Sequence, residues 1–270
     1  MTGSFLDTTI VVHMAEGTGQ EKASGEAFVR SNQPAGTPFY ALRELLDGRV
    51  RLICEVHNML RAAENPPEAI AALTRRSPAE GRKRMARVDV FRQAAQHVFA
   101  ANPSGPRDDE KREMLQYLML KANGLWLKSR KLRSVDVVQP LACFNNGKLT
   151  LGPSKELRGP NDSFTCVRTE RCAAAAYMYD KKIELGKLID ALHQNKVDQR
   201  IANKNETNQR RKALKELSKQ GPSEFSKQKC RALGDAYFAS MCPIGSVVLT
   251  TNLDDHTPLC AALGKEAKKP

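Results

Sequence analysis

Two short runs of β-branched and apolar residues lie near opposite ends of the 270-residue chain, and acids accompany both. Residues 4–12 read SFLDTTIVV and contain Asp7, whereas residues 246–251 read SVVLTT and precede Asp254 and Asp255. Such runs are typical of strands buried in a parallel sheet. Because the carboxyl ends of parallel strands face a common crevice, the acids at the two ends of the chain are expected to converge. The sequence therefore predicts an α/β fold whose parallel sheet uses both ends of the chain.

The remainder of the chain has mainly helical periodicity. Helices are expected, from the spacing of apolar residues and from Gly and Pro boundaries, over residues 21–31, 37–48, 49–64, most of 68–133, 164–195, 230–245 and 254–264. The Gly-, Pro- and Asn-rich residues 140–163 predict a loop region with a small hairpin around Asn146 and Gly147.

The chain is strongly basic, with a formal net charge of +13. An excess of this size indicates a polyanionic partner, either nucleic acid or an anionic membrane surface. The membrane is the weaker expectation, because no stretch approaches the roughly 18 apolar residues of a spanning helix. The N-terminal residues lack the basic start and the cleavage site of a signal peptide, so a cytoplasmic location is expected.

The cysteines and histidines give little sign of a site of their own. The seven cysteines are scattered and never spaced as CxxC, which argues against a disulfide framework or a zinc ribbon. They are expected to be reduced packing residues. His13 and His256 lie near the acidic segments, but packing or capping is the favoured role for each.

Four acidic segments carry a resemblance to a known family. They are FLDTT with Asp7, RELLDG with Glu44, LGDAYFAS with Asp235, and VLTTNLDDH with Asn252 and Asp255. In this order they resemble the acidic motifs of the PIN-domain nucleases, which include the toxins of bacterial toxin–antitoxin pairs. The resemblance covers residues 3–50 and 228–266.

The resemblance implies a three-layer α/β/α core and a metal-dependent ribonuclease that leaves a 5′-phosphate and a 3′-hydroxyl. By this resemblance Asp7, Glu44, Asp235 and Asp255 are catalytic and bind Mg²⁺ or Mn²⁺. The chemistry is reasonable, since crowded carboxylates repel each other and a phosphate until a divalent cation offsets their charge. Two alternatives are open: Asp254 competes with Asp255 as a ligand, and Glu64 competes with Glu44.

The same resemblance divides the chain into three parts. Residues 1–64 and 228–270 are expected to form the two halves of the core, separated by a mostly helical, basic insertion over residues 65–227. RNA is the expected partner, with DNA left open, and an inhibitor protein or a second copy of the chain are further candidates. Basic residues expected to contact nucleic acid are Arg82, Lys83, Arg84, Lys128, Arg130, Lys131, Arg210, Arg211 and Lys212.

Less specific explanations exist for the same residues. Asp7 and Asp254 are also consistent with helix N-caps, and Glu44 is also consistent with an exposed helical residue. Basic runs are often solvated helix faces. A PIN-fold protein that binds nucleic acid or a partner without catalysis is the alternative function.

Overall fold

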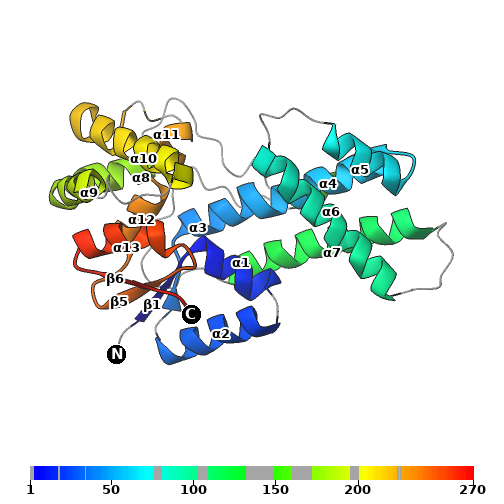
Figure 1. Ribbon diagram of the computed structural model, residues 1–270, viewed down its shortest axis with the longest axis horizontal. Coiled ribbons are helices and arrows are strands. Elements are labelled where there is room, and N and C mark those ends of the chain that lie inside the picture. Colours follow the sequence, from blue (N-terminus) through cyan, green and yellow to red (C-terminus); the bar gives the residue numbers. More distant parts are fainter. Residues whose placement is uncertain are drawn as a thin grey trace. The chain divides into compact units, whose positions relative to one another are not determined.

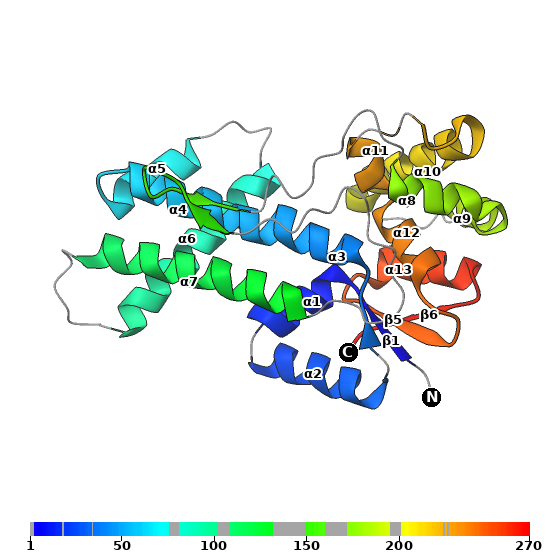
Figure 2. The same ribbon diagram turned by 180° about the vertical axis from the view of Figure 1, so that it is seen from behind.

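The computed structural model describes residues 3–17, 19–33, 35–75, 81–101, 109–131, 149–159, 172–194, 201–223, 225 and 227–270. These residues form a mixed α/β structure that is mostly helical (Figures 1 and 2). They fall into two compact units. The first holds the described residues up to Arg43 and from Cys172 onward, and the second holds Glu44–Lys131 and residues 149–159.

Within the described residues, the first unit contains one four-stranded sheet, and every pair of neighbouring strands in it is parallel. The strand order is β2 (Ala35–Gly36), β1 (Gly3–Leu6), β5 (Ser246–Leu249) and β6 (Glu266–Lys268). Strands β1 and β5 pair along their whole length, and Leu6 lies opposite Leu249 at their carboxyl ends. The predicted parallel sheet between the two ends of the chain is therefore confirmed.

The N-terminal strand is shorter than the sequence predicts. Strand β1 ends at Leu6, and Thr8–Glu16 form helix α1 instead of continuing the strand. Asp7 is the N-cap of α1: its backbone is extended, and its carboxylate accepts a hydrogen bond from the Thr8 amide at 2.7 Å. This cap satisfies an otherwise unpaired helix donor, and it outweighs the β-propensity of the following TTIVV residues. Only the first part of the run over residues 4–12 is therefore a strand, and Asp7 follows directly after its end, as the resemblance implies.

Helices make up most of the first unit. In chain order they are α1, α2 (Gly19–Ser31), α3 (Phe39–Glu44), α8 (Ala173–Asp180), α9 (Lys182–Gln194), α10 (Ile201–Gln220), α11 (Lys227–Ala232), α12 (Gly234–Met241) and α13 (Leu253–Ala262). Figure 1 draws α2 below the strands and α13 above them, and α13 packs against β6 and α12. Helices α8 to α10, which were expected to lie within an insertion, belong to the same unit as the sheet.

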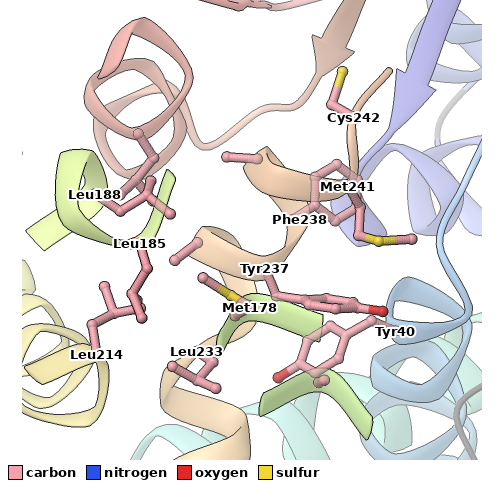
Figure 3. Packing of buried hydrophobic residues seen from close by; sticks show 14 of the residues in the cluster. Tyr40, Met178, Leu185, Leu188, Leu214, Leu233, Tyr237, Phe238, Met241 and Cys242 are labelled. Atoms are coloured by element: carbon pink, nitrogen blue, oxygen red, sulfur yellow. The ribbon is translucent and has the colours of Figure 1, made fainter. Parts of the chain in front are cut away.

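Helix α12 is the centre of the first unit's hydrophobic core. Figure 3 shows Tyr237, Phe238 and Met241 of α12 among side chains from several other elements. The rings of Phe238 and Phe5 lie 4.9 Å apart, and the rings of Tyr237 and Tyr40 lie 5.6 Å apart. Aromatic pairs of this kind add stability beyond the area they bury. They fix α12 against β1 and α3, and thus fix the position of Asp235 at its start.

The other end of α12 is held by a half-buried ammonium group. Lys265 Nζ donates hydrogen bonds to the carbonyl oxygens of Ala239 at 2.8 Å and Ser240 at 2.9 Å. These carbonyls have no partner within the helix, and a cation there also complements the helix dipole. Burial lowers the pKa of Lys265.

Several predicted helices have different limits. The helix predicted over 37–48 does not end at Gly48, because α3 is followed by the π-helix η1 (Leu45–Val50) and α4 (Arg51–Ala62). The helix predicted over 164–195 is broken between α8 and α9 at Lys181, and residues 164–171 lie outside the described residues. The hairpin predicted around Asn146 and Gly147 also lies outside them.

The second unit is a group of helices with a small hairpin. Besides η1 and α4 it contains α5 (Pro66–Thr74), α6 (Gly81–Ala101), α7 (Glu110–Lys131), β3 (Thr150–Leu151) and β4 (Leu157–Arg158). Helix α4 packs against α5, α6 and α7. The side chain of Asn58 on α4 fixes the hairpin, since it donates to the Leu157 carbonyl and accepts from the Leu157 amide. None of the helices in the described part of the chain is long and apolar enough to cross a membrane.

Buried cysteines lead to a first testable prediction. Burial raises the pKa of Cys54 and Cys260 to about 12 and that of Cys242 to about 11. Because the thiolate is the reactive species, these three thiols are expected to resist alkylation at pH 8 in the folded protein and to react after denaturation. Site-resolved mass spectrometry measures this. Rapid labelling of all three in the native protein would contradict their burial.

Candidate functional site

Asp7 lies at the carboxyl end of β1, next to Thr250 at the carboxyl end of β5. Its side chain is buried and accepts hydrogen bonds at Oδ2 from the hydroxyls of Thr9 at 2.8 Å and Thr250 at 2.7 Å. The backbone amide of Asp7 also donates to the carbonyl of Leu249 at 2.9 Å, which extends the pairing of the two strands by one residue. The strand pairing therefore determines where this carboxylate lies.

Two more predicted acids join Asp7 from the first turns of helices. Asp235 is the second residue of α12, and Asp255 is the third residue of α13. The positive end of a helix dipole favours a carboxylate at both positions. Asp255 is buried, and its Oδ2 accepts a hydrogen bond from the amide of Asn252 at 2.7 Å. The TTN motif predicts Asn252 at a turn, and in the structure the Asn252 side chain orients the carboxylate of Asp255.

Arg210 connects Asp235 and Asp255. Its terminal nitrogens form ion pairs with Asp235 Oδ2 and, at 3.3 Å, with Asp255 Oδ1. The residue is only 7% exposed. Burial opposes the charged form, but the two carboxylates outweigh it and raise the pKa of the guanidinium. The nucleic-acid contact predicted for Arg210 assumed that the side chain lies on an exposed basic face. The structure instead places this side chain between Asp235 and Asp255.

His256 completes the cluster between Asp7 and Asp235. Its Nε2 atom lies 3.7 Å from Asp7 Oδ2 and 3.7 Å from Asp235 Oδ1. The ring packs edge-on against Phe238 and is 1% exposed. Packing against Phe238 agrees with the packing role expected for His256. The proximity of its ring to Asp7 and Asp235 was not expected. Asp7, Asp235, Asp255, Arg210 and His256 are called the acidic cluster below.

The acidic cluster has the right chemistry for a hard divalent cation, because all three acids offer carboxylate oxygens. Its present geometry is not that of a metal cage. Within the described residues, no group of three or more His, Cys, Asp or Glu side chains is arranged to hold a metal ion. An ion would have to share Asp235 and Asp255 with Arg210.

The alternative acids lie elsewhere. Asp254 is exposed, whereas its neighbour Asp255 is the one within the cluster. Glu44 and Glu64 are exposed and belong to the second unit. The choice between Glu44 and Glu64 as the fourth acid stays a prediction.

The predicted nucleic-acid contacts are described only in part. The structure does not describe the side chains of Arg82, Lys83 and Arg84 on α6 or those of Lys128, Arg130 and Lys131 on α7. On α10, Lys212 is exposed and Arg211 is half-buried. Their role in RNA binding stays a prediction.

The sequence identified the three acids of the cluster as site residues, but it indicated packing or capping for His256 and a nucleic-acid contact for Arg210. The signal available for Arg210 was helical spacing. It is four residues before Leu214 and seven before Leu217, both fully buried, so it shares their face of α10.

Comparisons with known proteins do not assign the chain to a family. No protein-family model matches it, and neither a curated protein nor a solved structure does.

Proposed function

We propose that the chain is a metal-dependent nuclease with a three-layer, PIN-like core, which hydrolyses RNA at the acidic cluster. One observation carries this proposal. Three carboxylates from three separate elements converge where two neighbouring parallel strands end. Ligand and active sites of open α/β sheets occupy this same position, outside the carboxyl ends of the strands.

Asp7, Asp235 and Asp255 are the residues that would hold Mg²⁺ or Mn²⁺, with Glu44 or Glu64 as the predicted fourth acid. When bound, the ion supplies Lewis-acid chemistry that lowers the pKa of water and offsets the charge that develops on a phosphodiester. Three carboxylates that share a single guanidinium keep an excess of negative charge that would repel the phosphate, so hydrolysis at the cluster requires the metal.

The chain's own polar residues hold the acids in place. Thr9 and Thr250 both donate to Asp7 Oδ2, so this carboxylate cannot rotate without losing two hydrogen bonds. Thr250 Oγ1 in turn accepts a hydrogen bond from the backbone amide of Asn252 at 2.9 Å. Asn252 orients Asp255. Prior orientation of this kind is what an active site needs, because less reorganisation is left for the reaction itself.

RNA is the proposed substrate because of the charge of the chain as a whole. The excess of 43 Lys and Arg over 30 Asp and Glu favours a polyanion, even though the cluster itself is acidic. Binding to the phosphate backbone is therefore expected to weaken with added salt.

A binding protein without catalysis is the second candidate. The observation that favours it is the pairing of Arg210 with two of the three acids, which leaves fewer carboxylate oxygens for an ion. Such a protein would bind RNA in a salt-sensitive manner but would not cleave it.

Purified protein and end-labelled RNA distinguish the two candidates. With millimolar Mg²⁺ or Mn²⁺ the wild-type chain is expected to cleave RNA, and a chelator is expected to stop cleavage without abolishing RNA binding. The product ends are expected to be 5′-phosphate and 3′-hydroxyl. Salt-sensitive binding with no cleavage in either metal would reject the nuclease and favour the second candidate. Cleavage that persists in excess chelator would reject the metal site.

A further inference from the structure

Two cations of the second unit meet at one neutral oxygen. The Gln93 side chain of α6 accepts hydrogen bonds at Oε1 from Lys121 Nζ of α7 at 2.7 Å and from the Arg49 guanidinium of η1 at 3.2 Å. An amide orients the two cations, but unlike a carboxylate it carries no charge to offset theirs. Two positive charges held this close repel each other, and a bound anion would relieve the repulsion.

The helices explain why these residues converge. Gln93 and His97 lie one turn apart on α6, and Tyr117 and Lys121 lie one turn apart on α7, so each pair shares a helix face. The two helices pack together with Gln93 beside Lys121 and His97 beside Tyr117. Arg49 comes from the π-helix η1, a rare form of helix that is frequent at functional sites.

An aromatic pair adjoins the two cations. The rings of His97 and Tyr117 are stacked, with centroids 4.3 Å apart and planes inclined by 26°. Lys121 Nζ lies 3.4 Å from the Tyr117 hydroxyl and 5.6 Å from the centre of its ring. His97 is exposed, so its ring is accessible from solvent. An exposed, fixed ring is a surface on which a nucleobase can stack, because every base has a π-face.

Arg49, Gln93, His97, Tyr117 and Lys121 are called the Gln93 cluster below. Gln93 and both cations are half-buried, so they are held by packing and can still be reached from solvent. If Gln93 served only to tie η1 and α7 to α6, a carboxylate at this position would bond the same two donors more strongly. The neutral amide instead leaves the positive charge of its two donors available to an anion.

We infer that the Gln93 cluster binds one nucleotide of single-stranded RNA, with its phosphate on Arg49 and Lys121 and its base on the His97 ring. The choice of RNA rests on the proposed function. Gln93 is a positioning residue, since it holds the two cations at the place where the phosphate binds. Cations beside a stacking surface are the usual means of holding single-stranded nucleic acid.

Fluorescence anisotropy with a labelled oligoadenylate measures this binding, and an excess of chelator prevents metal-dependent cleavage during the measurement. Gln93→Glu is the central variant, because a carboxylate still accepts from Arg49 and Lys121 but competes with the phosphate for them. It is expected to weaken RNA binding at least about tenfold while the midpoint of thermal unfolding stays the same or rises. Replacement of both Arg49 and Lys121 by Gln is expected to weaken binding and to reduce its log–log salt dependence by about 0.7.

Inorganic polyphosphate, a probe without bases, separates the phosphate contact from the stacking contact. His97→Ala is expected to weaken oligoadenylate binding about tenfold and to leave polyphosphate binding unchanged, since it removes only the stacking surface. Gln93→Glu is expected to weaken the binding of both probes. Gln116→Glu is the matched control, because it adds the same charge at an exposed position of α7 outside the cluster and is expected to bind like the wild type.

Wild-type affinity for both probes in the Gln93→Glu and His97→Ala variants would overturn the Gln93 cluster as an RNA site and leave hydrolysis at the acidic cluster untouched. Equal weakening by Gln116→Glu and Gln93→Glu would also overturn it, because net charge rather than position would then determine the affinity. If Gln93→Glu does not fold, His97→Ala decides, since the exposed ring can be removed without opening a core. No oligoadenylate binding by the wild type would overturn this inference together with the RNA substrate of the proposed function.

Discussion

Asp7→Asn is expected to reduce RNA cleavage in Mg²⁺ or Mn²⁺ by at least about a hundredfold, because it removes the charge of a proposed metal ligand while keeping its shape. The fold is expected to survive. Asparagine can still cap α1 by accepting the hydrogen bond from the Thr8 amide, and the hydroxyls of Thr9 and Thr250 can turn to accept from the new amide.

The measurement compares cleavage rates at saturating RNA with the midpoint of thermal unfolding. Asp190→Asn is the control, because Asp190 is an exposed acid on α9 of the same unit. Parent-like cleavage by the Asp7 variant would remove Asp7 from the site. Loss of cleavage together with loss of folding would assign Asp7 a structural role only, as the cap of α1.

The double replacement of Asp235 and Asp255 by Asn is expected to lower the free energy of unfolding by about 3–5 kcal/mol in the absence of divalent ions. Both substitutions keep the shapes of the side chains, but they remove the two carboxylates that form ion pairs with the buried charge of Arg210. Burial already opposes that charge, and Asp235 and Asp255, with a smaller contribution from Glu206, raise the pKa of the guanidinium. Urea unfolding with a chelator present measures the change.

A third substitution separates this explanation from simple disruption. If the cost comes from the unpaired charge, Arg210→Met in the Asp235 and Asp255 double variant is expected to restore a large part of the lost stability, since a buried ion pair can often be replaced by apolar packing. A double variant as stable as the parent would contradict the buried ion pairs. A triple variant that is less stable than the double variant would show that packing by Arg210, rather than its charge, is what the protein needs.

The fold was predictable where apolar runs are short and bounded. The runs around Phe5 and Val248 indicated paired strands, and Leu6 does lie opposite Leu249. The limits of β1 were not predictable from propensity, because TTIVV favours a strand and the Asp7 cap makes it a helix. Strand β6 was missed because Glu266 and Lys268 give an edge strand no apolar pattern.

The acids of the candidate site were predictable because each of them belongs to a recognisable sequence motif. Asp7, Asp235 and Asp255 were all selected, and they do lie together through His256 and Arg210. Arg210 was assigned to a basic surface because an Arg-Arg-Lys run gives no sign of which side chain turns inward. Its partners are 25 and 45 residues away, and only tertiary packing brings them to it. The fourth acid, Glu44 or Glu64, belongs to the second unit, so it stays a prediction.

Anomalous scattering from a crystal grown or soaked with Mn²⁺ tests most directly whether the acidic cluster is a metal-dependent active site. A metal-dependent active site is expected to show Mn²⁺ at the cluster, in contact with carboxylate oxygens of Asp7, Asp235 and Asp255. The same map shows whether Glu44 or Glu64 provides a further ligand. A cluster without Mn²⁺, at a concentration of the ion that supports RNA cleavage, would contradict a metal-dependent active site at these acids.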